Sequence, residues 1–125
     1  MDKVVHFEIP ADDVERAKKF YKKVFDWKME AFSDMEYTMI QTTAVDENHM
    51  PTEQGAINGG MMKRQVPVKC PVITIAVQDI EQTLNNVKKM GGESVRGKMQ
   101  VGDMGYAAYF KDTEGNVIGL WQKIS

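Results

Sequence analysis

The stretch Ile9-Pro10-Ala11-Asp12-Asp13-Val14-Glu15 decides the fold, because a matching stretch returns as Ile75-Ala76-Val77-Gln78-Asp79-Ile80-Glu81. A shift of 66 positions aligns the two without a gap. Both read as the end of a strand followed by an acidic cap and the start of a helix. An internal repeat of this length indicates two similar modules in one domain, module one over 1–66 and module two over 67–125.

A strand is expected to open each module, because apolar residues alternate there with other residue types. In the first module one face carries Val5, Phe7 and Ile9, and the opposite face carries Val4, His6 and Glu8. In the second module the corresponding faces carry Ile73, Ile75 and Val77, and Val72, Thr74 and Ala76. The first-named face of each strand is expected to pack against a helix.

An amphipathic helix is expected after each of these strands. Asp12, with Glu15 three residues later, is the expected N-cap of the first helix, and Asp79 is the expected N-cap of the second. Gly91-Gly92 is expected to end the second helix. Lysine pairs near both C-termini, Lys22-Lys23 and Lys88-Lys89, favour the helix dipole.

Three strand-like runs follow each helix, so that the predicted order is βαβββ twice. The runs are Lys28–Phe32, Tyr37–Thr43 and Ala56–Lys63, then Glu93–Val101, Tyr106–Lys111 and Val117–Ile124. A polar loop is expected over 46–54, a connector near 65–69 and a tight turn over 112–116. The alternation does not settle which faces of the runs at 37–43 and 106–111 line a ligand surface.

Composition excludes several classes of function. The chain has 125 residues, 42% of them apolar and 27% charged, with a formal net charge of −2, which gives no basic surplus for nucleic-acid binding. No apolar run is long enough for a signal peptide or a membrane span. Cys70 is the single cysteine, so no internal disulfide can form, and we expect a cytoplasmic protein.

Several motifs, taken in order, carry a family resemblance. They are Phe7–Asp13, Ala17–Tyr21, Phe25–Trp27, Asn58–Lys63 and Phe110–Asn116. Together they resemble the glyoxalase/bleomycin-resistance/dioxygenase superfamily, whose members are also called vicinal-oxygen-chelate proteins. The resemblance covers essentially the whole chain. It implies an α+β fold in which two βαβββ modules form an incomplete eight-stranded barrel with a concave cup, and it implies a homodimer.

The resemblance also implies four metal-ligand positions, at the first and last strand of each module, and most of them are lost here. His6 stands at the first of these positions, and the repeat pairs it with Val72. On the last strands the matching positions are Gly119 and one of Asn58, Gly59 and Gly60, with Gly59 favoured. Because a specific site needs three or four protein ligands, we expect no metal and no other cofactor. A rebuilt metal site would need Glu8 or Asn58 as an additional ligand.

His6 and Glu8 are the candidate catalytic residues, since a carboxylate and an imidazole on one strand face can reach the same small ligand. His6 has three interpretations: a hydrogen-bonded core histidine, a ligand-contacting or acid–base group, or a metal ligand. His49 is interpreted as an exposed loop residue. The expected ligand-binding residues are His6, Glu8, Gly59, Met61, Gly119 and Trp121.

The leading hypothesis is a metal-independent small-molecule binding protein of unknown specific activity, and whether it is also an enzyme is left open. One alternative is a metal-dependent lyase, isomerase or dioxygenase with substituted ligands. A further alternative is a ligand-sensing or protein-interaction module. The expected partners are a small molecule and a second copy of the chain, with neither nucleic acid nor membrane.

Overall fold

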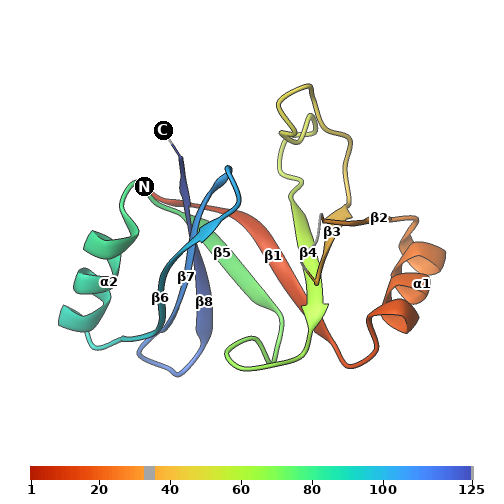
Figure 1. Ribbon diagram of the computed structural model, residues 1–125. Coiled ribbons are helices and arrows are strands. Elements are labelled where there is room, and N and C mark those ends of the chain that lie inside the picture. Colours follow the sequence, from red (N-terminus) through yellow and green to blue (C-terminus); the bar gives the residue numbers. More distant parts are fainter. Residues whose placement is uncertain (33–35, 125) are drawn as a thin grey trace. The chain divides into compact units, whose positions relative to one another are not determined.

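A computed structural model describes residues 1–32 and 36–124, and Figure 1 shows its course. Two helices and eight strands follow one another in the expected order. They are β1 (Lys3–Ala11), α1 (Val14–Phe25), β2 (Lys28–Ala31), β3 (Tyr37–Gln41), β4 (Asn58–Lys63), β5 (Val72–Ala76), α2 (Ile80–Lys89), β6 (Glu93–Val101), β7 (Gly105–Lys111) and β8 (Val117–Lys123). The chain divides into a first unit, His6–Pro71, and a second unit made of Met1–Val5 and Val72–Ser125.

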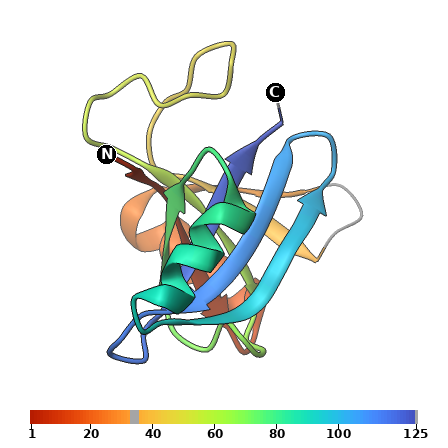
Figure 2. The same ribbon diagram turned by 90° about the vertical axis from the view of Figure 1, so that its left-hand side faces the viewer.

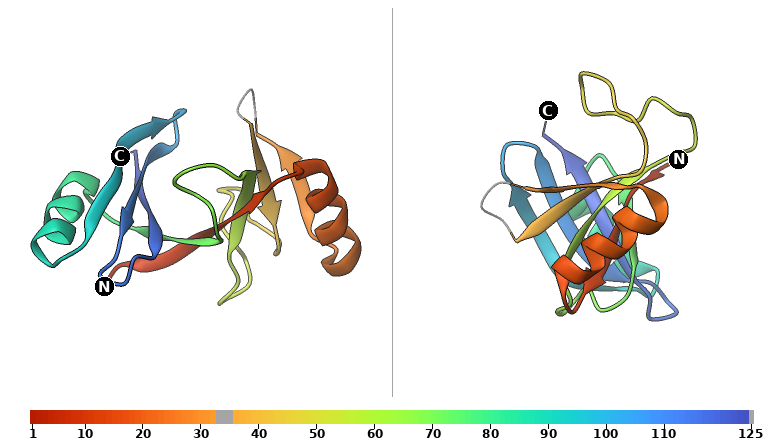
Figure 3. Two further views of the ribbon diagram at one scale, coloured as in Figure 1. Left: turned by 90° about the horizontal axis from the view of Figure 1, so that it is seen from below. Right: turned by 90° about the vertical axis from the view of Figure 1, so that its right-hand side faces the viewer.

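The strands of the first unit are hydrogen-bonded in the order β2-β3-β4-β1. β1 and β4 run parallel, with His6 opposite Asn58 and Glu8 opposite Gly60. β4 and β3 run antiparallel, with Met39 also opposite Gly60. Helix α1 lies along one side of these strands, as the right-hand view of Figure 3 shows. The opposite side of the strands therefore does not face α1.

The core of the first unit lies between these strands and α1. Ala11, Ile40 and Met61 are buried at its centre, and Met61 has no exposed surface. Half-buried residues of α1 and its flanks pack against them, namely Val14, Ala17, Tyr21, Trp27 and Met29, together with Phe7 and Ile9 of β1. The alternation in β1 predicted this face correctly for Phe7 and Ile9.

The second unit repeats this arrangement with the order β5-β8-β7-β6. Figure 2 shows α2 lying across its strands. The core between them holds Ile80, Leu84, Ala108 and Leu120, with Ile75, Val77, Tyr106 and Phe110 packed against it. Tyr106, Ala108 and Phe110 thus occupy the helix-facing side of β7, which settles the orientation that alternation left open.

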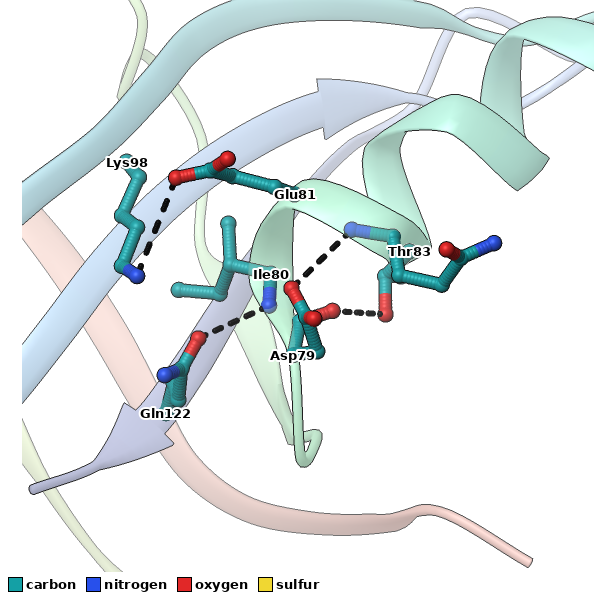
Figure 4. A network of polar contacts seen from close by, with 7 residues as sticks. Asp79, Ile80, Glu81, Thr83, Lys98 and Gln122 are labelled. Atoms are coloured by element: carbon teal, nitrogen blue, oxygen red, sulfur yellow. Dashed lines mark hydrogen bonds and ion pairs between the residues drawn. The ribbon is translucent and has the colours of Figure 1, made fainter. Parts of the chain in front are cut away.

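The N-terminus of α2 is fixed both by its own cap and by β8 (Figure 4). Asp79 is the N-cap, as expected, and its side chain accepts a hydrogen bond from the Gln82 amide at 3.1 Å. The Ile80 amide donates to Oε1 of Gln122 at 2.8 Å. One of the amides that a helix start leaves without an intrahelical partner is therefore satisfied by a strand of the same unit.

The expected cap of α1 is wrong by one residue. Asp13, and not Asp12, is the N-cap, and its Oδ1 accepts from the Arg16 amide at 3.0 Å. Asp12 instead pairs with Arg64, with Nε 2.9 Å from Oδ1. Two consecutive aspartates offer two possible starts, and the backbone at Asp13 has the extended conformation that a cap requires.

The α+β fold of two βαβββ modules is confirmed. The strands after each helix match the predicted runs, except that several are shorter by one or two residues and β7 begins one residue earlier, at Gly105. No helix within residues 1–32 and 36–124 is long and apolar enough to cross a membrane.

Met61→Ala is expected to lower the free energy of unfolding by about 2–5 kcal/mol, because it leaves a cavity in a fully buried site. Met50 is 57% exposed, so Met50→Ala is the matched control and should change stability by less than about 0.5 kcal/mol. Urea denaturation followed by circular dichroism measures both. Equal losses in the two variants would contradict the placement of Met61 in the core.

Candidate functional site

The face of the first unit opposite α1 carries a short series of polar side chains. His6 and Glu8 lie on β1 two positions apart and therefore share this face. The hydroxyl of Tyr37, from β3, lies 2.9 Å from Nε2 of His6 and 2.9 Å from Oε2 of Glu8. Glu8 is 7% exposed, and His6 and Tyr37 are half-buried. We call these three residues the polar triad.

The direction of the hydrogen bonds fixes the tautomer of His6. The Tyr37 hydroxyl has a single proton, which it uses to donate a hydrogen bond to Glu8. The oxygen of Tyr37 is then the acceptor in its contact with His6, so Nε2 of the imidazole carries the proton. In a neutral imidazole the other ring nitrogen, Nδ1, is left with a lone pair that can accept a hydrogen bond.

Gly60 makes room for the tyrosine. It lies opposite Glu8 in the β1–β4 pairing, and a Cβ built on it would be 1.9 Å from Oη of Tyr37 and 2.0 Å from Cζ. No side-chain atom fits in that space while the tyrosine is there. The polar triad therefore requires glycine at position 60.

Burial keeps His6 uncharged. Desolvation lowers the pKa of His6 from 6.5 to about 4, because an apolar environment disfavours the imidazolium. At neutral pH the imidazole is therefore neutral, in agreement with its role as a single donor to Tyr37. The interpretation of His6 as a hydrogen-bonded, partly buried histidine fits this geometry, and the Nδ1 lone pair leaves a ligand-contacting role open.

Gly59 and Met61, two of the expected ligand-binding residues, lie on the other face of β4. A Cβ on Gly59 would be 2.4 Å from the carbonyl oxygen of Phe7 and 2.6 Å from its ring, which belongs to the helix-facing side. Met61 is fully buried in the core. Their alternation with Gly60 places both against α1, so the structure brings neither of them to the polar triad.

The strand pairing also corrects the position that corresponds to Gly119. Glu8 is opposite Gly60, and Thr74, its counterpart 66 residues later, is opposite Gly119. The counterpart of Gly119 is therefore Gly60 and not Gly59. The alignment that favoured Gly59 was therefore wrong by one residue, and in a strand a shift of one residue exchanges the two faces.

The donors on this face do not fit a divalent cation. Nε2 of His6 and Oε2 of Glu8 both bond to Tyr37, and Gly60 has no side chain. Oδ1 of Asn58 accepts from the backbone amides of Thr42 and Thr43, at 2.7 and 3.1 Å, and so holds the chain beyond β3. Within residues 1–32 and 36–124 no three His, Cys, Asp or Glu side chains are grouped closely enough to hold a metal ion.

The remaining candidates belong to the second unit. Gly119 and Trp121 share a face, as expected, since they pair with Thr74 and Ala76 on β5. A Cβ on Gly119 would be 2.8 Å from Oγ1 of Thr74, and one on Gly105 would be 2.7 Å from the Trp121 ring. Glycines thus make room for a threonine and an indole. A ligand-binding role for Gly119 and Trp121 stays a prediction.

Three further residues from the sequence analysis take no part in the hydrogen bonds of the polar triad. Val72, which the repeat pairs with His6, is 3% exposed at the start of β5. His49 is exposed in the loop after β3, where Oδ1 of Asp46 accepts from the Asn48 and Met50 amides. Cys70 is an exposed free thiol. The interpretation of His49 as an exposed loop residue is confirmed.

Tyr37 is the site residue that sequence reasoning did not assign. The alternation of Tyr37, Met39 and Gln41 placed these three side chains on one face, without showing which way that face points. Gly60 could have been the signal, because a glycine in mid-strand beside a large aromatic residue is typical of close approach. To infer the position of Tyr37 from Gly60, one must know the β3–β4 register, which depends on the long loop between the two strands.

Comparison with known proteins identifies the family. A model described as "Bleomycin resistance protein-like N-terminal" matches residues 3–43. A glyoxylase-like domain-containing protein of Didymella fabae is 33% identical over 112 residues, which cover 87% of this chain and 84% of that protein. The chain belongs to the glyoxalase/bleomycin-resistance/dioxygenase superfamily. The resemblance of its motifs to that superfamily is therefore confirmed.

Two further comparisons give lower sequence identity. A putative glyoxylase, CFP32, of Mycobacterium bovis is 26% identical over 129 residues, which cover 92% of this chain and 43% of that protein. A variant of methylmalonyl-CoA epimerase from Streptomyces coelicolor, in complex with 2-nitronate-propionyl-CoA, superposes with a TM-score of 0.67 at 12% identity over 98% of each chain. The latter similarity shows the fold alone.

The depressed pKa of His6 makes stability depend on pH. Between about pH 6.5 and pH 4 the unfolded chain binds a proton at this residue and the folded chain does not, so acidification favours unfolding. The free energy of unfolding should fall over this window by an amount on the order of 3 kcal/mol. Urea denaturation at pH 7, 5.5 and 4.5 measures the fall.

His6→Gln isolates this contribution, because glutamine does not titrate. The variant should lose that part of the pH dependence, and the matched control His49→Gln should keep it. An identical pH dependence in the wild type and His6→Gln would show that the imidazole is not desolvated.

Gly60→Ala should displace Tyr37 and break the polar triad. Overpacking of this kind costs about 1–3 kcal/mol. Gly97 in β6 is the matched control, because a Cβ there meets nothing within 4 Å, and Gly97→Ala should stay within about 0.5 kcal/mol of the wild type. Chemical denaturation measures the free energies of unfolding of the two variants and of the wild type. A harmless Gly60→Ala would argue against the close approach of Tyr37.

Proposed function

We propose that this protein binds a small organic molecule on the polar face of its first unit without the help of a metal ion. The observation that carries the proposal is the polar triad: a partly buried series of hydrogen bonds whose first member, His6, presents an unprotonated Nδ1. Buried polar groups that form a connected series are expensive to maintain and often mark a ligand site. The superfamily membership of the chain supports the binding of a small molecule, and the case for binding without a metal ion rests on the polar triad alone.

The chemistry of the polar triad favours a particular class of ligand. Nδ1 of His6 accepts a hydrogen bond, and a neutral imidazole offers no positive charge to an anion. The carboxyl group of Glu8 at the other end disfavours an anion further when it is ionised. The ligand is therefore a neutral molecule that donates an O–H or N–H group to Nδ1. Nothing in this arrangement calls for a chemical step, so the proposal is binding.

Two expectations from the sequence accompany this proposal. A homodimer remains the expected assembly, and the cytoplasm the expected location, since a free exposed thiol at Cys70 is compatible with a reducing compartment. The alternatives, a metalloenzyme with substituted ligands and a protein-interaction module, are outcomes of the experiment below.

The experiment is a thermal-shift screen of neutral hydroxy- and amide-bearing metabolites, against anionic analogues of the same size. At least one neutral compound should raise the melting temperature, because a ligand that binds only the folded state stabilises it. His6→Ala should abolish the shift, and Tyr37→Phe should reduce it, since the loss of the hydroxyl leaves the tautomer of His6 unfixed.

His49→Ala is the matched control and should keep the full shift. Native mass spectrometry of tag-free protein, purified without chelators, accompanies the screen and reports retained metal, retained ligand and oligomeric state. Stoichiometric metal that is lost in His6→Ala would support the metalloenzyme instead. Stabilisation by anions only, or a shift that survives in His6→Ala, would contradict the proposed site.

A further inference from the structure

The hydroxyl of Tyr37 stands between two groups that commonly bind divalent transition metals. Imidazole nitrogen and carboxylate oxygen suit Zn²⁺ and Ni²⁺, and zinc binds them at about 2.0–2.2 Å. Nε2 of His6 and Oε2 of Glu8 each lie 2.9 Å from Oη. The two atoms are therefore separated by at most twice that distance. One ion bound by both atoms would require them to lie within about 4.4 Å of each other, which is twice the longer zinc–ligand distance.

The oxygen of Tyr37 occupies the place where such an ion would sit, and it satisfies both groups. It accepts a hydrogen bond from the imidazole N–H and donates one to the carboxylate. We propose that Tyr37 is a built-in substitute for a cation, and that its side chain is what keeps His6 and Glu8 from binding a divalent transition metal. Tyr37 acts here as a positioning residue.

Gly60 explains both why the tyrosine oxygen fits in the place of a cation and why β4 supplies no metal ligand there. The strand pairing identifies Gly60, the counterpart of Gly119, as the last-strand position on the face of His6 and Glu8. A glycine supplies no ligand atom, and its missing Cβ leaves the space that Oη fills, since that Cβ would be 1.9 Å away. The glycine that leaves position 60 without a donor is thus the same residue that makes room for the tyrosine hydroxyl.

This inference does not depend on the proposed ligand. It follows from the geometry of three side chains and one glycine, and its test uses a metal ion alone. Failure to find an organic ligand would leave it standing, and failure of the metal test would leave the thermal-shift screen as evidence for binding at His6.

The test is titration of tag-free Tyr37→Ala with Ni²⁺ in a calorimeter, beside the wild type. Tyr37→Ala should bind at least tenfold more tightly than the wild type, because the point between the two donors is now open to the ion and to water. Tyr37→Phe should show no gain, since its ring still fills most of the space. Ni²⁺ should also raise the melting temperature of Tyr37→Ala more than that of the wild type.

Two double variants locate the bound ion. Tyr37→Ala/His6→Ala should return to wild-type affinity, and Tyr37→Ala/His49→Ala should keep the gain, which controls for surface histidine. Tyr37→Ser replaces Tyr37→Ala if the latter fails to fold, because a serine hydroxyl is too short to reach both donors. Three results would each overturn the proposal: wild-type binding as tight as that of the variant, no gain in a folded variant, or a gain that survives the loss of His6.

Discussion

Two hydrogen bonds of one phenolic oxygen hold together the polar side of the first unit. Oη of Tyr37 meets Nε2 of His6 and Oε2 of Glu8 at 2.9 Å each, and Glu8 is almost wholly buried. A buried carboxyl group without partners would be costly, so the tyrosine is part of what allows Glu8 to lie on β1. The same contact fixes the tautomer of His6 and so decides which ring nitrogen can meet a ligand.

That contact depends on backbone features far apart in the sequence. The parallel β1–β4 pairing sets Gly60 beside Glu8, the antiparallel β3–β4 pairing brings Tyr37 alongside, and Asn58 holds the chain where it leaves β3. Each of these is a matter of register, in which a shift of one residue exchanges the faces of a strand. The core against α1, with Met61 at its centre, makes such a shift unfavourable because it would expose buried apolar surface.

The repeat and the alternation in β1 predicted the two βαβββ modules, because they depend on the local period of apolar residues, and the family resemblance implied the α+β fold that these modules form. They also placed His6 and Glu8 correctly on one face. The sequence could not place Gly60 opposite Glu8, since that depends on pairing across the loop at 42–57, and the alignment chosen instead was one residue off. Gly59 and Met61 were assigned to the ligand surface for that reason. Tyr37 was left unassigned because the direction of its strand face follows from the same register.

The protonation of the His6 ring tests this account most directly. Long-range proton–nitrogen NMR correlations at pH 7, on protein labelled with ¹⁵N, report which ring nitrogen carries hydrogen. The account predicts a neutral imidazole with its proton on Nε2, and a change in the nitrogen shifts of that ring alone when Tyr37→Phe is compared with the wild type. A doubly protonated ring, or a neutral ring with its proton on Nδ1, would contradict it.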